Sequence, residues 1–146
     1  MFVSMPFVSI VIVHWQGKAR LRRCLEALRG DAAAAAIPRD ELELVLVLNG
    51  PEAEADGNDD AVVGAWPERI RGTLPRNRGF AVGANAGIDR ASAEWISTLN
   101  DDTEVETGFL AALLAAAERA APRCGSCGNE AEEERDHAHA DPVVAE

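Results

Sequence analysis

The sequence predicts an α/β fold in which an open, mostly parallel sheet is flanked by helices. Short apolar, β-branched segments alternate along the chain with longer segments of helical period. The first of the short segments is a mostly apolar, β-branched run, as in a strand that is buried on both faces of a parallel sheet. The order strand, helix, strand, uncertain element, strand, helix, strand, helix therefore favours parallel pairing through right-handed crossovers.

Four segments have the character of strands, and the weakest of them is interrupted by Gly72. The predicted strands are Phe7–His14, Glu41–Leu48, Arg69–Leu74 and Glu94–Leu99. Between the second and third strands, Glu52–Asp60 is polar and acidic and is expected to be a loop. The pattern of Ala61–Trp66 fits a short helix or a strand, and both stay open.

The first predicted helix is Lys18–Leu28, in which three leucines recur on one side. Gly30 and Asp31 are expected to end it. The alanine run Ala32–Ala36 either extends the helix or forms a loop, and Pro38 stops it in both cases.

The two later helices differ in composition. Gly79–Arg90 contains Gly83 and Gly87, each of which costs a helix about 1 kcal/mol. That cost indicates that the backbone there approaches a neighbour or a ligand closely. Glu106–Ala121 is rich in alanine and leucine and is expected to be an ordinary amphipathic helix.

Composition limits the classes of function. The chain has 146 residues, enough for one domain, and a net charge of −11, which argues against general binding to nucleic acid. No apolar run approaches the roughly 18 residues of a transmembrane helix, and the amino terminus lacks the pattern of a secretory signal. Three cysteines do not form a disulfide scaffold, so a cytoplasmic location is expected. Peripheral association with a membrane stays open.

Much of the acidity lies at the carboxyl end. Residues 125–146 contain seven acidic residues and one arginine, and large apolar residues are nearly absent there. Such a segment cannot bury enough surface to offset the entropy of ordering. We therefore expect one domain over residues 1–123 and a disordered acidic tail over 124–146.

The tail raises one separate hypothesis, a zinc site. Its four candidate ligands are Cys124, Cys127, His137 and His139. The two histidines are closer together than in usual zinc motifs, so coincidence is favoured over zinc.

Polar groups follow three of the predicted strands. These are His14-Trp15-Gln16, Asn49-Gly50 and Asn100-Asp101-Asp102. In open α/β sheets, ligands bind beyond the carboxyl ends of the strands, so these groups should converge on one rim. The first strand is followed by neither a G-x-G-x-x-G fingerprint nor a phosphate-binding lysine loop.

Several of these segments together resemble glycosyltransferase family 2, inverting enzymes of the GT-A fold, and its rhamnosyltransferase-like branch in particular. The resemblance covers about residues 7–123. It is carried by four segments in order: VSIVIVHWQG with LRRCLEAL, LVLVLNGP, NRGFAVGANAGI and WISTLNDDTEVETGFL. The resemblance implies a Rossmann-like nucleotide-binding half and transfer of a sugar, with inversion, from a nucleotide-diphosphate sugar to an acceptor.

The last segment resembles the family's D-x-D-type metal motif. The resemblance makes Asp102 the ligand of a divalent cation, Mg or Mn, and Asp101 the partner of the ribose. A hard cation of this kind is often held by one or two carboxylates and the substrate's phosphates. The alternative is that both acids form a solvated turn or cap a helix over Thr103–Glu106.

The other implied contacts to the nucleotide sugar are Trp15, Asn49, Asn77 and Gly79. Trp15 matches an aromatic that stacks on the base, with an ordinary tryptophan at the edge of the core as an equal alternative. For His14, a strand-end histidine held in hydrogen bonds is favoured over one that faces the nucleotide.

This sequence also departs from the family pattern. Leu48 stands where the family has an aspartate that contacts the base. Nothing after Pro122 resembles the half that binds the acceptor and supplies the general base, so no catalytic base is assigned. Two alternatives to a transferase follow: a truncated, non-catalytic remnant that binds nucleotide sugars, and a small interaction protein that acts through its acidic tail.

Overall fold

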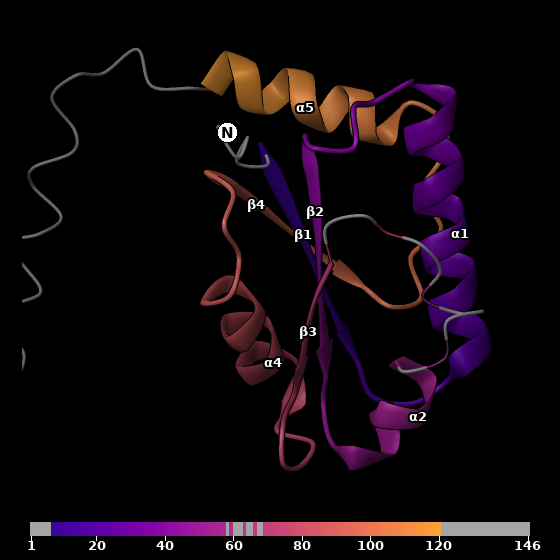
Figure 1. The fold of residues 1–146 in the computed structure, drawn as a ribbon, viewed down its shortest axis with the longest axis vertical. Coiled ribbons are helices and arrows are strands. Elements are labelled where there is room, and N and C mark those ends of the chain that lie inside the picture. Colours follow the sequence, from indigo (N-terminus) through magenta and orange to yellow (C-terminus); the bar gives the residue numbers. More distant parts are fainter. Residues whose placement is uncertain (1–6, 58, 60–62, 64–65, 67–68, 121–146) are drawn as a thin grey trace, which may run out of the picture.

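The computed structural model describes residues 7–57, 59, 63, 66 and 69–120 (Figure 1). The predicted tail, the zinc candidates within it and most of Ala61–Trp66 lie outside these residues. The helices and strands are β1 (Val8–His14), α1 (Lys18–Ala34), β2 (Leu42–Leu48), the 3-10 turn η1 (Pro51–Ala53), α2 (Glu54–Gly57), β3 (Arg69–Thr73), α4 (Gly79–Ile88), β4 (Trp95–Asn100) and α5 (Phe109–Ala120).

The four strands form one parallel sheet in the order β3-β2-β1-β4. All four predicted strands are confirmed within one residue at each end, and so is the α/β class. β1 and β2 are central, and every residue of both is buried. This explains why their sequences are apolar almost throughout.

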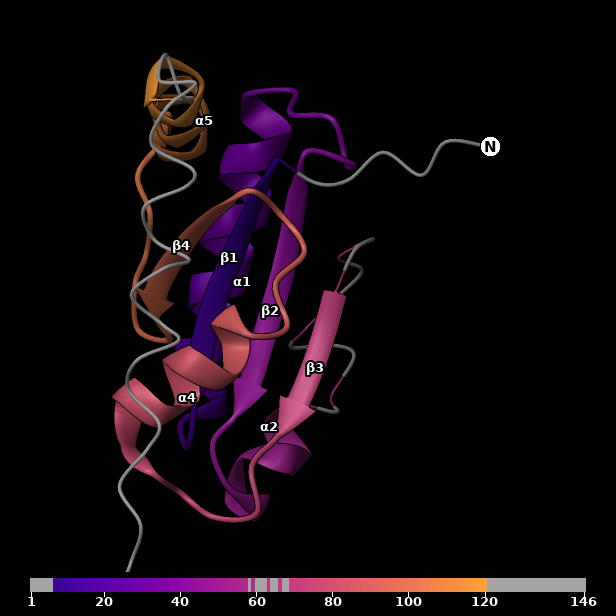
Figure 2. The same cartoon turned by 90° about the vertical axis from the view of Figure 1, so that its left-hand side faces the viewer.

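Helices cover both faces of the sheet, as Figures 1 and 2 show. On one face α1 and α5 pack against alternate residues of the central strands, among them Ile10, Ile12 and Leu46. On the other face, α4 packs against the intervening residues. The alternation follows from the two-residue period of a strand, which sends successive side chains to opposite faces.

Close packing of α4 explains its two interior glycines. A Cβ added at Gly83 would lie 2.5 Å from Val13 Cγ1, and one at Gly87 would lie 2.3 Å from Val11 Cγ1. Both distances are too short for carbon atoms, so only glycine lets this helix lie so near the sheet. The predicted close approach is therefore confirmed, and the neighbour is the sheet itself.

The predicted end of the first helix is wrong. α1 continues through Gly30 and Asp31 to Ala34. The Asp31 side chain is buried and accepts hydrogen bonds from the backbone N–H groups of Gly108 (2.6 Å) and Leu110 (2.7 Å). Asp31 thus caps α5 from another helix, and these two bonds favour continuing α1 beyond the expected stop.

Three other elements differ from prediction. The expected loop Glu52–Asp60 contains part of η1 and all of α2, α4 ends at Ile88, two residues before the predicted end, and α5 begins at Phe109, three residues after the predicted start. Gly108 has a φ of +94°, which is outside the right-handed helical region and delays that start.

Within the described residues, none of the helices combines the length and apolar character needed to cross a membrane.

Candidate functional site

The register of the sheet brings the predicted site segments to one edge. His14 is level with Leu48, Val13 with Asn100, and Leu48 with Thr73. The Asn49 N–H donates to the His14 carbonyl at 2.7 Å, which joins the ends of β1 and β2 beyond the regular ladder. The expected convergence at the carboxyl edge is therefore confirmed in the backbone.

Asn49 holds the turn that precedes α4. Its side chain is buried, and its amide nitrogen donates to Asn77 Oδ1 (3.1 Å) and to the Gly79 carbonyl (3.2 Å). Its amide oxygen accepts from the Arg78 N–H at 3.0 Å, and Asn77 Oδ1 also accepts from the Gly79 N–H at 2.9 Å. Asn49 therefore acts on the edge by shaping the turn, while Asn77 and Gly79 themselves are exposed.

Gly50 allows this turn to lie against the end of β2. Its φ is +122°, and a Cβ there would lie 2.9 Å from the backbone nitrogen of Asn77. Both observations require glycine, because a side chain would collide with backbone that cannot move aside cheaply. The Asn49-Gly50 pair thus makes one rigid corner of the edge.

A second corner is built around His14, the last residue of β1, whose side chain is fully buried. Its Nδ1 lies 2.6 Å from Asp101 Oδ2, and its Nε2 lies 3.0 Å from Asp56 Oδ2. Burial acts to lower the pKa of His14, but the hydrogen bonds to Asp101 and Asp56 outweigh it and raise the pKa above 6.5. The favoured interpretation of His14, a histidine held in hydrogen bonds, is confirmed.

Asp56 is the site residue that sequence reasoning missed. It lies in the acidic segment expected to be a loop, and the structure places it in α2, beyond the carboxyl ends of β1 and β2 (Figure 1). One hint of such an acid was present in the sequence: His14 stands at the end of a buried strand, and a buried histidine needs polar partners. Nothing in the sequence pattern indicates which of the many acids supplies them.

Asp102 and Trp15 are accessible at this edge. Asp102 is exposed and lies in a turn closed by the Thr103 N–H donating to the Asn100 carbonyl at 3.2 Å. The helix-capping alternative is wrong, because residues 103–106 are not helical and Asp31 caps the helix that follows. Trp15 is 44% exposed, so its ring offers a free apolar surface.

The part of the chain that the structure describes contains no group of three or more histidines, cysteines or acids arranged to hold a metal. A cation held partly by substrate phosphates does not need such a cage, because one or two carboxylates suffice. The exposed Asp102 carboxylate fits that mode of binding.

Cys24 lies on α1 next to this edge, and its Sγ is 3.7 Å from the Asn100 carbonyl oxygen. Burial, with smaller contributions from Asp101 and Asp102, raises its pKa to about 11. The thiol therefore stays protonated at neutral pH and is inert, as expected for a buried cysteine.

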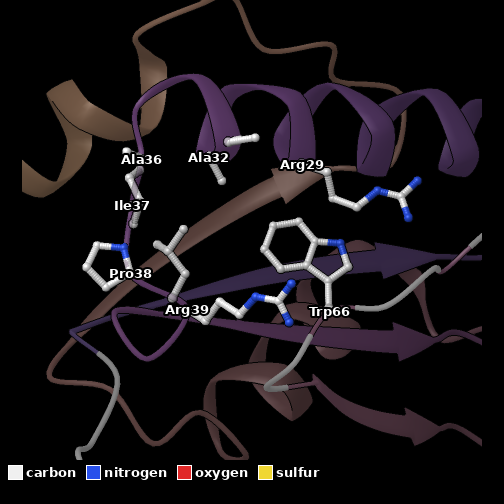
Figure 3. Close-up of a pocket in the computed structure, with 9 residues that line it drawn as sticks. Arg29, Ala32, Ala36, Ile37, Pro38, Arg39 and Trp66 are labelled. Atoms are coloured by element: carbon white, nitrogen blue, oxygen red, sulfur yellow. The ribbon is translucent and has the colours of Figure 1, made fainter.

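The opposite edge of the sheet has a hollow of about 390 Å³, shown in Figure 3. It lies beside the start of β2 at Leu42, between the end of α1 and Trp66, and the side chains of Arg29 and Arg39 extend on either side of the Trp66 ring. None of the predicted site residues lines it, so this hollow is separate from the candidate site.

Together, the parallel sheet and the polar carboxyl edge define an open α/β domain whose candidate site lies where ligands bind in such sheets. The sequence matches the model of the family described as glycosyl transferase family 2 over residues 9–141. The chain therefore belongs to glycosyltransferase family 2.

Individual proteins that are similar to this chain are also named as glycosyltransferases. The chain is 25% identical over 109 residues to the "Putative glycosyltransferase EpsH" of Bacillus subtilis (strain 168), covering 75% of this chain and 30% of that protein. Its fold is similar to that of the Pyrobaculum calidifontis mannosyltransferase PcManGT, which was solved with GDP-Man and Mn²⁺. The TM-score is 0.66 and the sequence identity 17%, and the match covers 82% of this chain and 33% of that one.

The fold is also similar to that of S. aureus TarS 1–349, with a TM-score of 0.60, 15% identity and coverage of 77% and 32% of the two chains. The chain thus spans about a third of the length of each of these proteins. These structural similarities support the GT-A fold that the sequence predicted.

Proposed function

We propose that this chain forms the donor-binding part of a glycosyltransferase that moves a sugar, with inversion, from a nucleotide-diphosphate sugar to an acceptor. The observation that carries the proposal is the convergence of Trp15, the Asn49 turn and Asp101-Asp102 on one edge of a family 2 domain. No comparison favours the alternatives of a non-catalytic remnant or an interaction protein that acts through its tail.

In the proposed site each residue makes a different contact with the donor. Trp15 stacks on the base, and Asp101 accepts hydrogen bonds from the ribose. The exposed turn of Asn77 and Gly79, held by Asn49, faces the nucleotide sugar. Asp102 holds the divalent cation.

The cation, Mg²⁺ or Mn²⁺, would neutralise the diphosphate as the bond to the sugar breaks. Manganese in the PcManGT complex supports this choice of metal for the family. The described residues form the proposed donor-binding part. No general base and no acceptor site are therefore assigned among them.

The proposal predicts that binding of nucleoside diphosphates requires both metal and Asp102. Titration calorimetry with UDP, GDP and dTDP should give saturable binding of at least one of them in the presence of Mn²⁺. Asp102→Ala should lower that affinity by about 100-fold, since the loss of a metal ligand costs roughly 3 kcal/mol.

Asp89→Asn is the matched control, because Asp89 is an exposed acid at the other end of α4. It should leave the affinity unchanged. Equal affinities for the wild type and Asp102→Ala would contradict the role of Asp102. Absence of binding for all three nucleotides, with and without Mn²⁺, would contradict the proposed function itself.

A further inference from the structure

His14 joins three segments that are distant in the sequence. Its two ring nitrogens contact Asp56 on α2 and Asp101 after β4, which lie 42 and 87 residues further along the chain. The two carboxylates are only 19% and 16% exposed, and the ring between them is fully buried. Solvent therefore does not reach the ring, although both carboxylates keep a small exposed area.

The chemistry of the partners fixes the protonation of the ring. A neutral imidazole has one N–H donor and one acceptor nitrogen, whereas an ionised carboxylate only accepts. Two ionised carboxylates can both be hydrogen-bonded to one ring only if both nitrogens carry protons. We propose that His14 is a buried imidazolium that positions the Asp101 carboxylate for the ribose of the donor nucleotide, with Asp56 holding the ring from the opposite side.

The groups around His14 agree with a positive charge. Among the residues that the structure describes, Asp56 and Asp101 are the acids in contact with it. The neighbouring strand presents the apolar Leu48, and the Cys24 thiol beside Asp101 stays neutral. With His14 charged, the three groups carry one net negative charge instead of two. This lowers the repulsion that a diphosphate would meet at the edge.

Positioning matters because Asp101 follows the last described strand and lies in a turn. The 2.6 Å contact to His14 Nδ1 engages Oδ2 and restrains the carboxylate. A carboxylate has about four acceptor sites, so Asp101 can still accept hydrogen bonds from ribose hydroxyls. This step rests on the proposed function, whereas the charge of His14 does not.

The charge of His14 can be measured directly by ¹⁵N NMR of the full chain. The two ring nitrogens have similar shifts in an imidazolium and very different shifts in a neutral ring, and the signals absent from His14→Gln identify His14. We expect the imidazolium pattern to persist above pH 6.5, where a histidine of ordinary pKa is mostly neutral. A neutral pattern there would overturn the proposal, because the ring would then carry only one N–H donor for its two partners.

The positioning role is tested with two ligands, a nucleoside diphosphate and its 2′-deoxy analogue, each with Mn²⁺. In His14→Gln, which keeps one donor and loses the charge, the affinity for the ribose form should fall about tenfold and that for the deoxy form by less than threefold. Equal losses for both ligands would make His14 merely structural and overturn the positioning role.

Asp56→Asn provides a second variant should His14→Gln fail to fold, because it leaves His14 and Asp101 in place. It should also weaken the ribose form more than the deoxy form, and equal effects would again overturn the proposal. Failure of the wild type to bind any nucleotide would refute the proposed function, and with it the positioning role, while the NMR result on His14 would stand.

Discussion

The two edges of the sheet each bury an ionised cluster, and the two clusters are built differently. At the amino edge, the Glu43 carboxylate accepts hydrogen bonds from the hydroxyls of Ser9 and Ser92 and from the Ser92 N–H, at 2.5 to 2.9 Å. At the carboxyl edge, His14 lies between two partly exposed carboxylates, and the exposed Asp102 is adjacent.

The difference separates stability from function. Every partner of Glu43 is a neutral donor of the chain itself, so this cluster is closed and serves to tie the segment before β4 to the sheet. At the carboxyl edge, Asp56 and Asp101 each contact His14 through Oδ2, and both carboxylates stay partly exposed to groups outside the fold. An edge whose carboxylates can still accept hydrogen bonds is suited to a ligand. An edge whose polar groups are all bonded within the chain is not.

The two clusters also respond to pH in opposite directions. Burial acts to raise the pKa of Glu43, but the hydrogen bonds from Ser9 and Ser92 outweigh it and lower the pKa. The stability from Glu43 is therefore present above about pH 4.5, and it is lost as the pH falls through the lowered pKa of the folded state. The stability from His14 is present below pH 6.5, and it is lost as the pH rises through the raised pKa of the folded state.

The largest effect on stability is expected at the closed edge. Glu43→Gln should lower the free energy of unfolding by about 3 kcal/mol, because buried donors lose a charged acceptor. Urea denaturation at neutral pH measures this loss, and the variant should also lose part of the acid dependence of stability. Nucleotide affinity, measured where the variant is folded, should be unchanged.

Glu41→Gln is the control, as Glu41 is a neighbouring acid less deeply buried than Glu43. It should change the unfolding free energy by less than about 0.5 kcal/mol. A loss of nucleotide affinity in Glu43→Gln as large as that in Asp102→Ala would show that the two edges are not separable.

Helix α4 connects the two edges, and Gly87→Ala tests whether they share its position. The added methyl would lie 2.3 Å from Val11 and 3.0 Å from Val47, so we expect a loss of about 2 kcal/mol on urea denaturation. The displaced helix should also weaken nucleotide binding, because its first turn is bonded to Asn49.

Gly30→Ala is the same substitution in α1, where nothing lies within 4 Å of the added Cβ. It should stabilise the protein by about 0.5 to 1 kcal/mol through helix propensity alone. Losses of equal size at both glycines would contradict the packing argument for α4.

The sequence was informative where the signal is local and uninformative where it depends on distant partners. Runs such as VSIVIVH predict buried parallel strands, and the order of strands and helices then places their polar carboxyl ends together. By contrast, the role of Asp31 at α5 and the selection of Asp56 by His14 depend on contacts between segments far apart in the chain. No periodicity encodes such contacts, so a helix stop and a loop were expected at these two acids.

The smallest predicted effect concerns Trp15, which belongs to the open edge and contributes little to the core. Trp15→Leu should lower nucleotide affinity about tenfold, since stacking of a base on an aromatic ring is worth roughly 1 to 3 kcal/mol. Its effect on the unfolding free energy should stay below about 0.5 kcal/mol, because the ring is 44% exposed. Trp15→Phe keeps an aromatic face and should retain most of the affinity, which calorimetric titration can measure. If Phe and Leu weaken binding equally, the ring does not stack on the base, and Trp15 then belongs with the residues that only support the edge.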